Sequence, residues 1–154
     1  MLANKLDFSL QLLEEKGKIF LRLSGFSMFP FLQEGDVALI KKVAINELSI
    51  GDVIVFTQDQ KMIAHRLKEI IQKGNHFLLT TKGDTSKNND PVFTEKEYVG
   101  KIVSFNRKEK NITITTKFYE LIGTIIIKTT RLNTPFFVLN KRIWRRIWII
   151  RKKY

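Results

Sequence analysis

The chain has 154 residues, no cysteine and a formal net charge of +12 at pH 7. This length suits one domain with an ordinary core, and a hydrophobic share of 44% is normal for a soluble globular protein. Without cysteine, disulfides, thiol catalysis and thiolate metal sites are excluded, and with only two histidines a zinc site is not expected.

The positive charge is concentrated at the C-terminal end. Residues 1–116 contain 17 basic and 14 acidic side chains, whereas residues 117–154 contain ten basic and one acidic. We therefore divide the chain into an N-terminal helix (1–17), a core (18–116) and a basic, aromatic C-terminal segment (117–154). No cleavable signal peptide and no apolar run of about 18 residues, the length of a membrane-spanning helix, are predicted.

Periodicity predicts one helix followed by strands. Leucines at three- and four-residue spacing over residues 2–16, ending at Gly17, indicate a short amphipathic helix. Residues 60–71 also have helical propensity, but the turn at Gly74-Asn75 favours a strand that enters a hairpin. Short apolar or alternating runs between turns predict a mainly β core, with strands over 18–23, 37–40, 53–56, 60–71, 76–81, 98–105 and 112–116.

A tight turn over residues 24–36 holds the first candidate for chemistry, Ser27. Gly25 permits backbone angles that other residues avoid, Met28 and Phe29 can pack beneath the turn, and Pro30 fixes its exit. A hydroxyl held in so rigid a frame suits a nucleophile once a base removes its proton. The alternative is a structural loop whose serine bonds its own backbone.

Three other side chains could complete a catalytic site with Ser27. Histidine is the side-chain type suited to general base work near neutral pH, which makes His65 the candidate base. Asp84 and Asp90 supply carboxylates that could orient an imidazole and stabilise its charged form. Spacing alone leaves open whether these residues meet, and a histidine such as His65, considered by itself, is more often structural than catalytic.

Five segments occur in the order and approximate spacing of the type I signal peptidase and self-cleaving-repressor superfamily of serine peptidases, which the chain resembles over about residues 18–105. They are Ser27-Met28-Phe29-Pro30 with Gly35-Asp36, then Gly51-Asp52-Val53-Ile54, then His65-Arg66, then Lys82-Gly83-Asp84 with Asp90, and last Val99 to Val103. The usual bacterial signal peptidases and the repressors use a lysine as base. Histidine at that place resembles the endoplasmic-reticulum and archaeal branch, with its serine-histidine chemistry.

The resemblance implies a signal-peptidase-like β catalytic core with Ser27 as nucleophile and His65 as general base. It makes Asp90 the first choice for the orienting carboxylate and Asp84 a second, structural or assisting acid. Neither a metal nor another cofactor is implied. Arg66 is expected to be a structural ion-pair partner.

Two features depart from the superfamily pattern. Signal peptidases typically read Ser-Gly-Ser-Met, whereas Phe26 precedes the nucleophile here, so the oxyanion hole is expected to rely on backbone N–H groups such as that of Ser27, with Ser24 as a further candidate. The N-terminal transmembrane anchor is also not predicted, which leaves the C-terminal segment as the candidate for membrane attachment.

The last residues form a basic, aromatic pattern. On a helix, Ile143, Trp144, Ile147 and Trp148 share one face, with Arg142, Arg145 and Arg146 largely elsewhere. Such a helix is typical of peripheral membrane binding, and we expect residues 141–154 to contact a membrane surface. A helix docked on the protein itself is the main alternative, and a nucleic-acid-binding tail is less expected.

Together these observations predict a serine endopeptidase that cleaves signal or leader peptides through an acyl-enzyme. By the resemblance, its substrate is an extended segment with small side chains near the cut, added as a strand to a sheet edge. One alternative is a self-cleaving, DNA-associated regulator, for which the N-terminal helix is too small to be the DNA-binding domain. Another is a catalytically inactive peptide-binding module.

Overall fold

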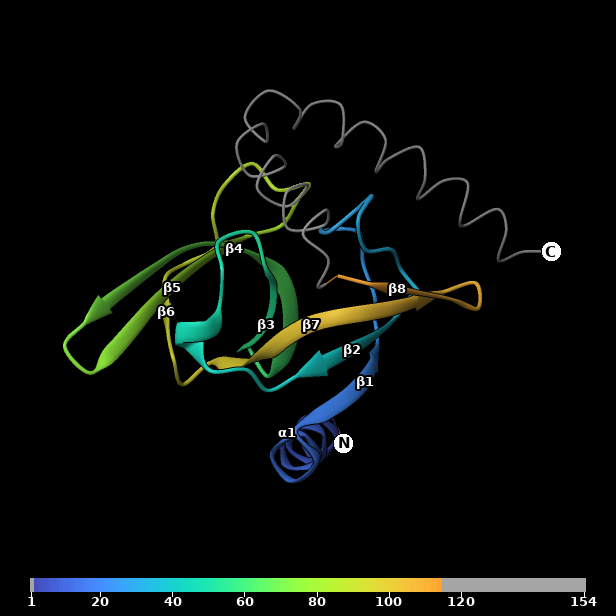
Figure 1. Cartoon of the computed structure of the whole chain (residues 1–154), viewed down its shortest axis with the longest axis horizontal. Helices are drawn as coiled ribbons and strands as arrows, with labels where there is room; N and C mark the ends of the chain where they lie inside the picture. The colour runs from blue at the N-terminus through green and yellow to red at the C-terminus, as the bar shows by residue number, and fades with distance from the viewer. Residues whose placement is uncertain (1, 115–154) are drawn as a thin grey trace.

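The computed structural model describes residues 2–114, which form one short helix and a curled antiparallel sheet (Figure 1). Helix α1 (Leu2–Lys16) is followed by β1 (Lys18–Arg22), β2 (Val37–Lys41), the 3-10 turn η1 (Ile45–Glu47), β3 (Val53–Gln58), β4 (Lys61–Lys73), β5 (His76–Lys82), β6 (Phe93–Thr94), β7 (Tyr98–Arg107) and β8 (Lys110–Thr113). The mainly β class and the N-terminal helix are thus confirmed. The predicted C-terminal helical segment lies outside the described residues.

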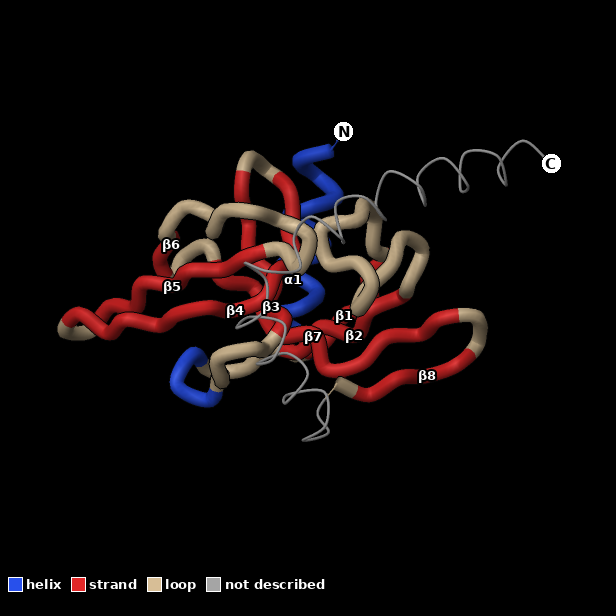
Figure 2. Tube along the Cα trace, turned by 90° about the horizontal axis from the view of Figure 1, so that it is seen from above, coloured by secondary structure: helices blue, strands red, loops and turns tan. Residues whose placement is uncertain are grey.

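The sheet runs in the order β1-β2-β7-β3-β4-β5-β6, and β8 pairs with residues 104–107 of β7. Strand β4 changes partner along its length, because residues 61–66 pair with β3 and residues 66–73 pair with β5. The β4–β5 and β7–β8 hairpins extend to opposite ends of the molecule (Figures 1 and 2). The strand predicted at residues 60–71 is therefore confirmed.

Apolar side chains gather in two clusters on the sheet. The larger contains Leu13 of α1, Met28 and Leu32 of the serine turn, and inward-facing residues of the sheet such as Ile40 and Val55. The smaller cluster is built on Leu48, Ile54, Leu67 and Leu79. The serine turn therefore packs directly on the main core, as the sequence predicts for Met28, which is 4% exposed.

Two Gly-Asp turns with the same structure precede β2 and β3. Gly35 and Gly51 have φ of 91° and 102°, which glycine adopts without strain. Asp36 accepts a hydrogen bond from the Gln33 backbone N–H at 2.8 Å and an ion pair from Arg107 at 2.7 Å. Asp36 and its counterpart Asp52 are almost fully buried. The carboxylate is the hydrogen-bond acceptor for a backbone N–H of the turn, and it fixes the turn to β7.

Asp52 makes the same contacts as Asp36. It accepts from the Ser49 backbone N–H at 2.8 Å, and Lys101 of β7 pairs with it at 2.7 Å. The shared pattern, a backbone N–H three residues earlier and a cation from β7, explains why a Gly-Asp pair precedes both β2 and β3.

Some elements have no strong local signal in the sequence. Strand β6 has two residues, and η1 spans three. Two hairpins turn at non-glycine pairs with positive φ, Asp59-Gln60 (50° and 58°) and Lys108-Glu109 (46° and 66°). Such turns usually contain glycine or asparagine, and here the pairing of the flanking strands imposes the conformation.

Replacing Asp36 by alanine is expected to lower the free energy of unfolding by about 3 kcal/mol, because it leaves the Gln33 N–H and the Arg107 guanidinium without their carboxylate. Urea unfolding of the variant measures this loss. Asp7→Ala, which removes the same side chain from an exposed position of α1, is the control and should change stability by less than about 0.5 kcal/mol. Equal effects at both positions would show that the capped turn contributes little.

Candidate active site

His65 and Asp90 form the best-defined polar contact in the site. His65 lies on β4 and is 9% exposed, and its Nδ1 is 2.7 Å from Asp90 Oδ2. The same carboxylate oxygen accepts the Thr81 hydroxyl at 2.7 Å, and the Asp90 backbone N–H donates to the Thr81 carbonyl at 2.8 Å. Because a carboxylate accepts, Nδ1 carries the proton, which leaves the Nε2 lone pair as the proton acceptor.

The serine turn is held by its own backbone bonds and by the core. The Phe29 N–H donates to Phe26 O at 3.2 Å, and the Leu32 N–H donates to Met28 O at 2.9 Å. With Met28 buried beneath it, Ser27 is partly exposed at the edge of the core. This is the frame that the sequence predicts, with Gly25 at a φ of 89° before it.

Gly83 is the point at which Ser27 and His65 approach each other. A Cβ atom built on Gly83 would lie 3.0 Å from the Ser27 carbonyl oxygen and 3.1 Å from His65 Nε2. The following Thr85 donates its N–H to Ser27 O at 2.9 Å, and its hydroxyl lies 3.2 Å from the carbonyl oxygens of both Phe26 and Ser27. The loop after β5 thus contacts both the serine turn and the edge of the imidazole that carries Nε2.

Asp84 makes a different contact from Asp90. Its two carboxylate oxygens accept from Arg66 Nε and Nη2, both at 2.8 Å, and Arg66 Nη1 donates to Gly51 O at 2.8 Å. Both side chains are almost completely buried, at 1% exposure for Arg66 and 3% for Asp84. Burial raises the pKa of Asp84 above its usual value, and the hydrogen bonds and charge of Arg66 oppose that rise. The geometry gives Asp84 a structural contact with Arg66, whereas Asp90 contacts the imidazole.

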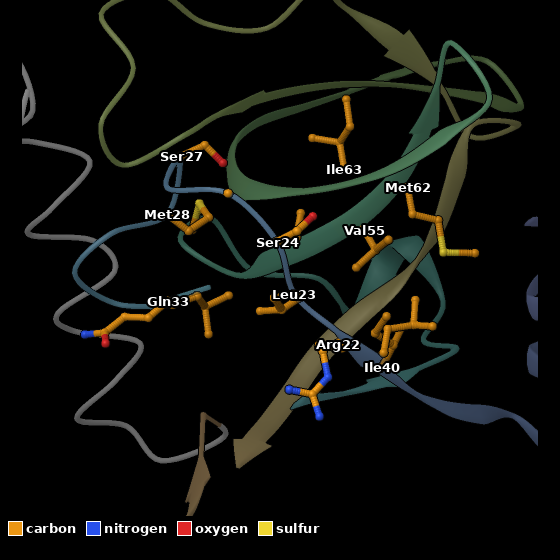
Figure 3. A pocket seen from close by; sticks show the side chains of 14 residues that line it. Arg22, Leu23, Ser24, Ser27, Met28, Gln33, Ile40, Val55, Met62 and Ile63 are labelled. Atoms are coloured by element: carbon orange, nitrogen blue, oxygen red, sulfur yellow. The ribbon is translucent and has the colours of Figure 1, made fainter. Parts of the chain in front are cut away.

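A pocket of about 400 Å³ opens beside Ser27 (Figure 3). Ser24 and Ser27 lie on one of its sides and Met62 and Ile63 on the other. The lining is mostly apolar, with contributions from Leu21, Leu23, Met28, Leu32, Ile40, Val55 and Ala64. An extended apolar segment with a reactive carbonyl at Ser27 therefore has a place to bind.

Two polar residues of the site have no recognisable signal in the sequence. Thr81 fixes Asp90 as described, and the Ser86 hydroxyl oxygen would lie 2.7 Å from a Cβ on Gly83. Both belong to or follow β5, next to the segment Lys82-Gly83-Asp84, but only the folded loop brings them to the imidazole. His76 lies elsewhere, with a side chain 72% exposed and paired to Glu95 at 2.7 Å.

The buried Arg66–Asp84 pair is expected to show strong energetic coupling. Arg66→Met and Asp84→Leu should each lower the free energy of unfolding by about 3–5 kcal/mol, because each leaves one buried charge without its partner. The double variant should lose clearly less than the sum of the two, since no buried charge remains. Denaturant unfolding of all four proteins gives the coupling, and simple additivity would contradict it.

Comparison with known proteins assigns the chain to a family. The profile of the family described as "Peptidase S24-like" matches residues 2–103. The chain is 39% identical over 79 residues to "Signal peptidase I W" of Bacillus subtilis (strain 168), an alignment that covers 50% of this chain and 41% of that relative. The match thus spans less than half of the relative's length. Because the family match covers well over half of the chain, the protein belongs to the peptidase S24-like family and is a serine peptidase at the level of that family.

Proposed function

We propose that this protein is a signal-peptidase-like serine endopeptidase that uses Ser27 as nucleophile and His65 as general base. The observation that carries the proposal is the hydrogen bond of 2.7 Å between His65 Nδ1 and Asp90, which leaves Nε2 facing Gly83 and the serine turn. This contact supports our assignment of the chain to the serine-histidine branch, in contrast to the lysine base of most of the superfamily. Asp90 is the orienting carboxylate, and Asp84 holds the structure through Arg66.

The reaction follows from this arrangement. Ser27 Oγ attacks the carbonyl carbon of the scissile peptide while His65 Nε2 takes the hydroxyl proton. Asp90 stabilises the resulting imidazolium through Nδ1–H. The imidazolium then gives its Nε2 proton to the leaving amine, the C–N bond breaks, and an ester of Ser27 remains. Water hydrolyses this ester and restores the enzyme.

The oxyanion of the tetrahedral intermediate requires hydrogen-bond donors at the serine turn. The backbone N–H of Ser27 is the first donor we propose, because it moves with the nucleophile. Ser24 lies in the same pocket and is our second candidate. One such donor typically contributes about 2.7 to 4 kcal/mol of transition-state stabilisation.

Two strand edges beside the pocket explain how an extended substrate would bind. In the described part of the sheet, residues 62–64 of β4 pair with β3 on one side only, because β5 joins β4 from Arg66 onward. Strand β1 is the first strand of the sheet and pairs with β2 alone within the same region. Leu21 of β1 and Met62 of β4 both line the pocket. A peptide laid along such an edge gains main-chain hydrogen bonds, and the apolar pocket selects its side chains.

We propose signal or leader peptides with small side chains near the cut as the substrate class. The name of the Bacillus relative, a signal peptidase, supports a substrate of this class. No observation on the described residues favours the alternative of a self-cleaving, DNA-associated regulator.

Cleavage of a purified signal-peptide-bearing precursor in detergent tests the proposal. Ser27→Ala and His65→Ala should abolish cleavage, and Asp90→Ala should lower kcat on the order of 10³-fold, because the imidazole loses its orientation and its counter-charge. His76→Ala replaces the other histidine of the sequence, which lies exposed and away from the site, and should retain full activity. Cleavage that persists in the Ser27→Ala variant would disprove the assignment.

We also propose that the basic segment over residues 141–154 binds a membrane surface peripherally. It lies outside the described residues, and the proposal rests on its sequence pattern of tryptophan and arginine. In the part of the chain that the structure describes, no helix has the length and apolar character needed to cross a bilayer.

Flotation with vesicles that contain acidic phospholipid tests this binding. The full chain should float, and Trp144→Ala/Trp148→Ala should reduce the floating fraction several-fold, because the indoles no longer insert at headgroup depth. Phe8→Ala, an exposed aromatic residue of α1, is the control and should leave flotation unchanged. Equal flotation of all three proteins would rule out the segment as the membrane contact.

A further inference from the structure

Ser86 places a second hydroxyl close to the imidazole nitrogen that faces the serine turn. Its Oγ and His65 Nε2 lie 2.7 Å and 3.1 Å from the same position, that of a Cβ built on Gly83. Ser86 is held there by its backbone N–H, which donates to Gly83 O at 2.9 Å, and by the neighbouring Thr85, which is 4% exposed and bonded to Ser27 O. The position of this hydroxyl is therefore set by the same loop that sets the site.

Two of the polar atoms around the bare face of Gly83 have complementary hydrogen-bonding capacities. Neutral His65 Nε2 accepts and the Ser86 hydroxyl can donate, whereas the Ser27 carbonyl oxygen already accepts from the N–H and the hydroxyl of Thr85. A water molecule just in front of this face can donate one proton to Nε2 and accept from the Ser86 hydroxyl. Ordered waters in proteins make two to four such bonds. The set is therefore suited to hold one water with a lone pair left over.

We propose that Ser86 positions the water that hydrolyses the acyl-enzyme. This inference rests on the proposed function and adds a residue to its second half-reaction, the hydrolysis of the acyl-enzyme. After the leaving amine has departed, the water oxygen attacks the acyl carbon bonded to Ser27 Oγ, and its proton passes to His65 Nε2. The C–Oγ bond then breaks, Ser27 Oγ recovers the proton from the imidazolium, and the carboxylic acid product leaves.

Glycine at position 83 is a condition for this arrangement. A methyl group there would lie 2.7 Å from Ser86 Oγ, within the distance at which one of the two must shift. It would also occupy the face on which the water is held. The absence of a side chain at Gly83 thus leaves room for the hydrolytic water as well as for the approach of Ser27 to the imidazole.

The role of Ser86 is separable from that of Ser27 by measuring the two half-reactions. The probe is the p-nitrophenyl ester of acetyl-alanine, for which nitrophenolate release reports acylation and steady-state turnover reports deacylation. Ser86→Ala should keep the rate of the first nitrophenolate release. Its steady-state turnover should fall about tenfold, which is the effect of one lost hydrogen bond. The acetyl-alanyl adduct on Ser27 should then accumulate and be visible in intact-mass spectra. Ser86→Thr, which keeps a hydroxyl, should restore much of the turnover.

Asn88→Ala is the matched control, because Asn88 is an exposed polar residue of the same loop, and it should behave as the wild type. Added hydroxylamine provides a second test, since this nucleophile carries its own reactive nitrogen. It should restore release of the acyl group in Ser86→Ala more strongly than in the wild type. A merely structural defect would lower acylation and deacylation together and would not respond in this way.

Three outcomes would overturn the inference. They are unchanged turnover in Ser86→Ala, a parallel loss of both half-reactions, and no gain from hydroxylamine. If instead the wild type and Ser27→Ala release nitrophenolate at the same rate, the proposed function itself fails, and the position of the water fails with it. The Ser27→Ala variant in the same assay therefore separates the two failures.

Discussion

The buried ion pair between Arg66 and Asp84 is the contact on which the active site depends. Arg66 follows His65 on β4, and Asp84 lies between Gly83 and Thr85. The pair therefore fixes the strand that carries His65 to the loop that holds the serine turn. A buried pair of this kind contributes little net stability compared with apolar side chains of the same volume, so its value here is geometric. Its forked, two-bond contact permits one relative position of strand and loop.

The way the sheet is built gives the site both rigidity and access. Strand β4 exchanges β3 for β5 at Arg66, immediately after the histidine. The half of β4 that precedes this residue has one open edge in the described sheet, and the pocket lies along it. Arg66 itself pairs with Val53 of β3 and with Lys82 of β5, and the half that follows pairs with β5. One strand thus has an open edge beside the pocket and a position next to it that holds the imidazole in place.

Local sequence patterns predicted the fold better than they predicted the site. Strand periods and glycine turns place most strands within a few residues, because half-buried strands and their turns are specified by near neighbours. Sequence patterns do not predict the two-residue strand β6 or the turns at Asp59-Gln60 and Lys108-Glu109, because the sheet imposes the conformation of these elements. The order of the five segments indicates which residues carry chemistry. Only the folded chain brings His65 to Asp90, 25 residues away, and sets the positions of Thr81 and Ser86. Sequence periodicity gives no information about these contacts.

The bond between Thr85 and Ser27 joins residues that are 58 positions apart in the chain. Closing a loop of that length carries an entropic cost, and pairing of the strands between the two residues reduces it. A chain in the course of synthesis therefore contains Ser27 and His65 before the loop that joins their surroundings has closed. In the proposed mechanism, proteolytic capacity is then a property of the finished sheet, and a nascent or partly unfolded copy has no assembled centre with which to cut itself or its neighbours.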